Sequence, residues 1–91
     1  MLAINLSTVS ERYIKKLPPK HKRQITEKIF KLAENPCPSD SSQLHGYKEY
    51  CRADIGEHRI IYRFSETVLF VTLVGKRNDD EVYRKLGRLL R

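Results

Sequence analysis

Three arginines stand in or next to segments whose residue pattern is typical of β-strands, and they are the side chains in this sequence best suited to chemistry. Arg52 and Arg59 lie in the two arms of a predicted hairpin, and Arg77 follows the next predicted strand. Packing gives a cation little reason to occupy such positions. A guanidinium group stays charged and presents its N–H donors in a fork that matches phosphate oxygens. We therefore expect the three arginines to converge on one face of a small sheet as a phosphate site, which predicts a protein directed at nucleic acid.

The hairpin that carries Arg52 and Arg59 is predicted from a period of two that begins at Tyr47. This period puts Arg52 and Asp54 on one face of the strand and the intervening apolar residues on the other. Gly56-Glu57 suits a tight turn, because glycine adopts the positive φ that a two-residue hairpin loop requires. The resulting register places Asp54 opposite Arg59. Arg59 could therefore bind a substrate, or it could form a cross-strand ion pair with Asp54 worth about 0.2–1 kcal/mol.

A strand and two helices are predicted before this hairpin. Residues 2–6 alternate as a short strand, and Thr8 and Glu11 have the spacing of a capping box at the start of a helix. Pro18-Pro19 ends this helix and starts the next. The second helix is predicted to bury one apolar stripe, which consists of Ile25, Ile29, Leu32 and Ala33. The Pro- and Ser-rich residues 35–46 follow as a loop within the domain.

Two further elements are predicted after the first arm of the hairpin. Ile60, Tyr62 and Phe64 alternate toward the core, and an apolar strand spans residues 68–74. Asn78-Asp79-Asp80 is predicted to cap a final basic helix over residues 80–90. The order strand–helix–helix–strand–strand–strand–helix predicts an α+β fold, in which a helical hairpin covers one face of a small antiparallel meander. The other face is expected to be free for function.

Composition indicates one domain over residues 1–91 that binds an anionic partner. The chain has 18 basic and 11 acidic residues, for a net charge of +7, which suits RNA, DNA or an acidic protein. The apolar run at 68–74 is far shorter than the roughly 20 residues of a membrane-spanning helix, and no signal peptide is expected. Cys37 and Cys51 lack the spacing of a disulfide framework or a metal site. We expect reduced thiols, no metal, no cofactor and a cytoplasmic location.

Three motifs in this order resemble the RelE/ParE superfamily. They are Leu44-His45-Gly46, the hairpin pattern Tyr-x-Arg-x-Asp-x-Gly-x-x-Arg, and a Val-Gly-Lys-Arg segment shortly before Tyr83. The resemblance covers essentially the whole chain, and the RelE branch is the closer match. It implies a microbial type II toxin that cleaves mRNA in the ribosomal A site without a metal and so inhibits translation. It also implies a neutralising antitoxin, and a toxin–antitoxin hetero-oligomer that binds operator DNA. The net charge of +7 predicts that this antitoxin is acidic and partly disordered.

The resemblance assigns roles to Arg52, Arg59, Arg77 and Tyr83, whose positions match the family's site. RNA cleavage by the 2′-OH needs a base, cations that stabilise the phosphorane, and an acid for the 5′ oxygen. The arginines suit the cation role, and Tyr83 could be a base or acid, stack on a base, or pack the last helix. The family's best-known members carry a second basic residue where this chain has Asp54. Asp54 could be the base, or it could orient Arg52 and Arg59.

Other titratable residues and other functions remain open at this point. His58 has a suitable ordinary pKa for proton transfer, but the alternation points it to the opposite face, whereas His21 and His45 are interpreted as surface residues. The basic run from Lys15 to Lys31 is interpreted as a solvated helical face that could contact ribosomal RNA. The alternative functions are a ParE-like inhibitor of DNA gyrase that does not cleave nucleic acid, and a decayed toxin that only binds antitoxin.

Overall fold

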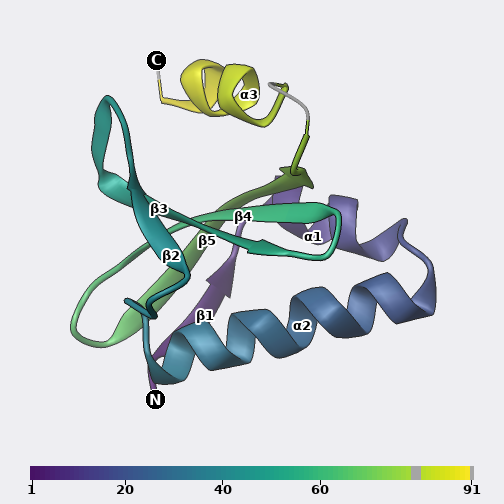
Figure 1. Cartoon of the computed structure of the whole chain (residues 1–91), viewed down its shortest axis with the longest axis horizontal. Helices are drawn as coiled ribbons and strands as arrows, with labels where there is room; N and C mark the ends of the chain where they lie inside the picture. Colours follow the sequence, from purple (N-terminus) through teal and green to yellow (C-terminus); the bar gives the residue numbers. More distant parts are fainter. Residues whose placement is uncertain (79–80, 91) are drawn as a thin grey trace.

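A computed structural model of the chain describes residues 1–78 and 81–90, and in these residues it has an α+β fold with one sheet (Figure 1). The elements in chain order are β1 Ala3–Leu6, α1 Thr8–Lys15, α2 Pro19–Glu34, β2 Ser41–Leu44, β3 Tyr47–Ile55, β4 His58–Phe64, β5 Val68–Lys76 and α3 Glu81–Leu89. The strands lie in the order β1-β5-β4-β3-β2. No described helix combines the length and the apolar character that a membrane crossing requires.

The sheet is mixed, whereas an antiparallel meander was expected. The three strands β3, β4 and β5 do form the antiparallel meander, but β1 pairs with β5 in parallel. The four-residue β1 carries no signal for a partner in its own pattern. Its place depends on the edge of β5 that the meander leaves unpaired, where the amide of Ala3 donates to the carbonyl of Thr67 at 2.9 Å.

The predicted loop over residues 35–46 is wrong in part, because it contains β2. The residues of β2 pair with β3 in the register Ser41 to Ala53, Ser42 to Arg52 and Gln43 to Cys51. This strand lies at the edge of the sheet, and edge strands are often short and polar. Its sequence therefore lacks the apolar alternation that would have revealed it. The pairing matters for function because it places Ser42 beside Arg52.

The predicted hairpin register is confirmed. Asp54 pairs with Arg59 and Ala53 with Ile60 across β3 and β4. Gly56 has a φ of 57° in the turn between them, a conformation in which glycine carries no steric penalty. The third strand of the meander, β5, continues to Lys76 rather than ending at residue 74.

One face of the sheet is covered by the helical hairpin, as expected. The stripe of α2 is confirmed, with exposed fractions of 0% at Ile25 and 4% at Ile29, and it packs on Ala53, Ile60 and Tyr62. Phe64 was expected on this core face as well, but it is 38% exposed. It lies at the end of β4, where it stacks on Tyr62 with a ring-centre distance of 6.5 Å.

The boundary between the two helices is confirmed, but the predicted N-cap of α1 is wrong. Ser7 caps the helix, because its hydroxyl accepts the amide of Ser10 at 3.1 Å and donates to the carbonyl of Thr72 at 2.7 Å. Thr8 is consequently the first helical residue. Glu11 forms an exposed ion pair with Lys15 instead of closing a capping box.

The second face of the sheet is covered by α3 and is not free, which corrects the expectation. Figure 1 shows α2 and α3 on opposite sides of the sheet. Val82 and Leu86 of α3 pack against Ile61 and Leu73 in a second apolar cluster. Gly75 permits this approach, because a Cβ there would lie 3.2 Å from the Val82 side chain. Of the predicted helix cap at 78–80, Asp79 and Asp80 lie outside the described residues.

Candidate functional site

Two arginines from neighbouring strands converge on the hydroxyl group of Tyr83 from α3. The Nη1 atom of Arg52 donates to this oxygen at 3.1 Å, and the Nη1 atom of Arg59 donates to it at 2.5 Å. The guanidinium carbon of Arg59 also lies 5.6 Å from the centre of the Tyr83 ring. The hydroxyl oxygen is therefore fixed in position by two cationic donors.

Asp54 holds the central arginine of this group by both of its carboxylate oxygens. Arg59 donates through Nε at 2.7 Å and through Nη2 at 3.1 Å. Arg77 approaches the same carboxylate, with its Nε atom 3.7 Å away. The hydrogen bond from Arg59, reinforced by the charges of Arg59, Arg77 and Arg52, lowers the pKa of Asp54 although burial acts in the opposite direction. The carboxylate is therefore ionised near neutral pH and is a good anchor for cations but a weak base.

Ser42 positions Arg52, and sequence reasoning did not find it. Its hydroxyl oxygen accepts a hydrogen bond from the Nε atom of Arg52 at 2.9 Å. This bond directs the outer edge of the Arg52 guanidinium toward Tyr83. The only signal that could have identified Ser42 is the register of β2 on β3, which the polar sequence of β2 conceals.

Arg77 is the most exposed of the three cations. Its side chain is 51% exposed, compared with 13% for Arg59. The backbone amide of Arg77 donates to the carbonyl of Glu57 at 2.9 Å, and its Nη1 atom donates to the carbonyl of Gly56 at 3.4 Å. The β3–β4 turn thus holds Arg77 beside Asp54 while leaving much of its guanidinium open to a ligand.

The structure brings all five predicted site residues into one cluster of three guanidinium groups, one carboxylate and one phenol. They are Arg52, Asp54, Arg59, Arg77 and Tyr83. Three cations against one anion leave a net positive charge, which suits a phosphate group. In the part of the chain that the structure describes, His, Cys, Asp and Glu form no group of three or more that could hold a metal ion.

His58 lies on the opposite face of the sheet, as the alternation predicted. It is 3% exposed, its Nδ1 atom lies 2.9 Å from the Tyr13 hydroxyl, and its Nε2 atom lies 2.7 Å from Nδ1 of His21. His21 is therefore half-buried and bonded rather than the plain surface residue that was expected, whereas His45 is exposed. This cluster joins the helical hairpin to β4 and is remote from the arginines.

We expect the His58 cluster to make the fold sensitive to acid. Burial, followed by the neighbouring charge of His21, lowers the pKa of His58. Its stabilising effect is complete above the ordinary histidine pKa of about 6.5 and is lost as the pH falls through the lower pKa of the folded state. Protonation of His58 should lower the free energy of unfolding by about 1–3 kcal/mol, because the ring nitrogen that gains the proton can no longer accept a hydrogen bond.

Denaturant unfolding measured between pH 5 and pH 8 tests this expectation. The wild type should lose stability below about pH 6.5, and His58→Gln should flatten the curve in that range. His45→Gln is the matched control and should follow the wild type. Asp54 also has a lowered pKa, but protonation of its carboxylate lowers the stability only below the ordinary aspartate pKa of about 4. Parallel curves for wild type and His58→Gln would contradict the assignment.

Comparison with known families identifies the chain. The sequence model described as the ParE toxin of the type II toxin–antitoxin system parDE matches residues 8–81. The chain belongs to this family. It is thus a toxin of a type II toxin–antitoxin module, and the resemblance to the RelE/ParE superfamily is confirmed. A search of curated proteins found no matching relative.

Solved structures of related toxins share the fold. The RelBE2 complex of Mycobacterium tuberculosis contains a chain with a TM-score of 0.73 at 24% identity, covering 84% of this toxin and 98% of that chain. A double mutant of Escherichia coli toxin RelE in the free state has a TM-score of 0.81 at 20% identity and covers 99% of this toxin and 98% of that chain. Escherichia coli YafQ has a TM-score of 0.67 at 19% identity, covering 85% and 94%.

Proposed function

We propose that this toxin is an endoribonuclease of the RelE type, which cleaves mRNA in the A site of the ribosome and so inhibits translation. The observation that carries the proposal is the convergence of Arg52 and Arg59 on the Tyr83 hydroxyl, with Arg77 beside them. An inhibitor that works by binding alone has no need of a phenol held between guanidinium groups. Such a group suits the stabilisation of charge on a reacting phosphate.

The reaction uses the RNA's own 2′-OH as the nucleophile. The 2′ oxygen attacks the adjacent phosphorus, the bond from phosphorus to the 5′ oxygen breaks, and the products are a 2′,3′-cyclic phosphate and a free 5′-OH. Arg77 binds the non-bridging oxygens of the scissile phosphate, because its guanidinium is exposed. Arg52 adds a second positive charge beside this phosphate. The 2′-OH loses one proton and the 5′ oxygen gains one, so the reaction has no net change in protons. Tyr83 is placed to carry out one of these two transfers, and water carries out the other. Arg59 holds the phenol in place through its bond to the hydroxyl.

Asp54 acts as an orienting partner in this scheme and not as the base. Its carboxylate is occupied by the bidentate bond to Arg59, and those cations lower its pKa. We expect Asp54→Asn to lower cleavage by about tenfold, because an amide still accepts one bond from Arg59 and one charge-assisted hydrogen bond is lost. Cleavage of mRNA on programmed ribosomes, measured from pH 5 to pH 9, checks this. Abolished cleavage with a flattened acidic limb would instead make Asp54 the general base.

The ribosome and an antitoxin are the proposed partners. The ribosome supplies the positioning of the message, an effect that is worth several kcal/mol, so free RNA should be cut poorly. The structures of RelBE2 and of the RelE–RelB complex from Pyrococcus horikoshii OT3 are toxin–antitoxin complexes. A net charge of +7 suits a neutralising antitoxin that is acidic and folds on binding, and the hetero-oligomer would bind operator DNA.

Inhibition of DNA gyrase without cleavage is the second candidate, because the matching family model is that of ParE toxins. Fold alone does not decide between the two functions, since both types of toxin share it. The arginine cluster supports the ribonuclease, because a gyrase inhibitor does not require its phenol and cations in a reactive arrangement.

Controlled expression of the toxin in bacterial cells tests the proposal. We expect cuts in translated mRNA that are aligned with codons, mapped by sequencing of RNA 5′ ends, and no early response to DNA damage. Growth arrest with intact messages and a DNA-damage response would contradict the ribonuclease and support the gyrase inhibitor. Arg77→Ala expressed at the same level is the control for cuts that do not depend on the catalytic activity of the toxin.

A further inference from the structure

A basic hollow lies between Tyr47 of β3 and α3, the helix that also carries Tyr83. It has a volume of about 490 Å³ and is lined by Tyr47, Arg84, Gly87 and Arg88. Arg84 and Arg88 are exposed, and neither takes part in an ion pair among the residues that the structure describes. The hollow therefore combines an aromatic ring with two cations, and none of the described residues that line it carries a carboxylate.

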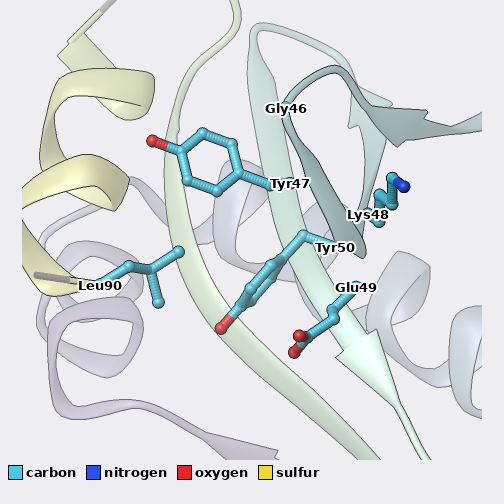
Figure 2. Close-up of a pocket in the computed structure, with 6 residues that line it drawn as sticks. All are labelled: Gly46, Tyr47, Lys48, Glu49, Tyr50 and Leu90. Carbon is cyan, nitrogen blue, oxygen red and sulfur yellow. The ribbon is translucent and has the colours of Figure 1, made fainter.

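Tyr47 also lines a second hollow, which differs in character. Figure 2 shows Tyr47, Tyr50 and Leu90 around this space, which has a volume of about 330 Å³. Lys48 and Glu49 both contribute to its lining, so a carboxylate there offsets the cation. An anion is therefore better accommodated on the side of Tyr47 that faces Arg84 and Arg88.

Gly87 lines the basic hollow without adding a side chain to it. Gly87 lies in the last turn of α3, and glycine inside a helix is less favourable than alanine by about 1 kcal/mol. A Cβ at this position would stand 3.6 Å from the hydroxyl of Tyr47. Alanine would just fit, but any longer side chain would occupy the space beside the Tyr47 ring.

We propose that this hollow binds the nucleotide next to the scissile phosphate of single-stranded RNA, with its base stacked on Tyr47 and its phosphate held by Arg84 and Arg88. The subsite rests on the proposed ribonuclease function and extends it. Gly87 lies four residues after Tyr83, which is about 6 Å along a helix. A strand whose phosphate lies at Tyr83 therefore has the hollow within reach of its neighbouring nucleotide. Stacking on tyrosine is tolerant of sequence, because every base has a π-face.

Binding of a six-nucleotide RNA with 2′-O-methyl groups, which cannot be cleaved, tests the subsite by fluorescence anisotropy. Tyr47→Leu should weaken binding roughly ten- to a hundredfold, and Tyr47→Phe, which keeps the ring, should restore it. The variant with both Arg84→Ala and Arg88→Ala should reduce the slope of log K against log salt by about 0.7 for each phosphate that it no longer neutralises. Arg23→Ala, an exposed cation on α2 beyond the other face of the sheet, is the matched control and should keep the wild-type slope.

Several results would overturn the subsite. They are unchanged affinity in Tyr47→Leu, equal losses in Tyr47→Leu and Tyr47→Phe, or an unchanged salt slope in the double arginine variant. On programmed ribosomes the same variants should raise KM more than they lower kcat, because the subsite binds substrate and transition state alike. If the wild type cuts ribosome-bound message and the variants cut it equally well, the subsite is wrong but the proposed function stands. If the variants bind RNA more weakly but the wild type cuts no ribosome-bound message, the subsite stands and the proposed function is wrong.

Discussion

Arg77→Ala should lower the cleavage of ribosome-bound mRNA by about a hundred- to a thousandfold. The expected size is that of removing one preorganised donor from an oxyanion hole, about 2.7–4 kcal/mol. Turnover should fall more than substrate binding, because the phosphorane carries more charge than the ground-state diester. Single-turnover cleavage on programmed ribosomes, compared with the binding of toxin to the same ribosomes, separates the two effects.

Arg77 is a favourable residue for this experiment because its loss should leave the fold intact. Its side chain is 51% exposed and its side-chain contact with Asp54 is long, at 3.7 Å, and surface ion pairs contribute little to stability. The matched control is Lys76→Ala, which removes an exposed cation one residue earlier. Lys76 pairs with His58 in the sheet register and should keep wild-type cleavage. Equal losses in the two variants would reduce the role of Arg77 to general electrostatic attraction.

The hairpin and its arginines were predictable from the sequence because a period of two fixes which side chains share a face. If Gly56 is placed in the turn, counting residues outward along both strands places Asp54 directly across from Arg59. The stripe of α2 and the proline boundary between the helices were predictable for similar reasons, since each depends on local spacing. A pattern of this kind determines the face of each residue within its own element.

The features that could not be predicted from the sequence are those that depend on contacts between residues far apart in the chain. β2 has polar residues on both faces because it lies at the sheet edge, so the support of Arg52 by Ser42 could not be found. The half-buried position of His21 follows from the packing of α2 on β4, which its own helix does not encode. The placement of α3 over the second face likewise depends on the close approach that Gly75 allows.

That placement of α3 gives the catalytic proposal its most direct test, because it brings Tyr83 to the arginines. Tyr83→Phe should lower turnover by at least about a hundredfold, within the range of 10²–10⁴ that general acid–base catalysis contributes. The ring can still pack against the apolar cluster of α3, so the thermal unfolding midpoint should change little. Only the hydroxyl that accepts hydrogen bonds from Arg52 and Arg59 is removed.

Tyr50→Phe is the matched control, since it deletes a phenol hydroxyl from a buried ring in the same apolar cluster. We expect it to cleave as the wild type does. A Tyr83→Phe variant with near wild-type turnover would leave the ring with a packing or stacking role only. If Asp54→Asn also abolished cleavage, the base would be the carboxylate and the proposed assignment of roles would be reversed. A large loss in Tyr83→Phe with a mild loss in Asp54→Asn is the combination that a phenol positioned by two guanidinium groups requires.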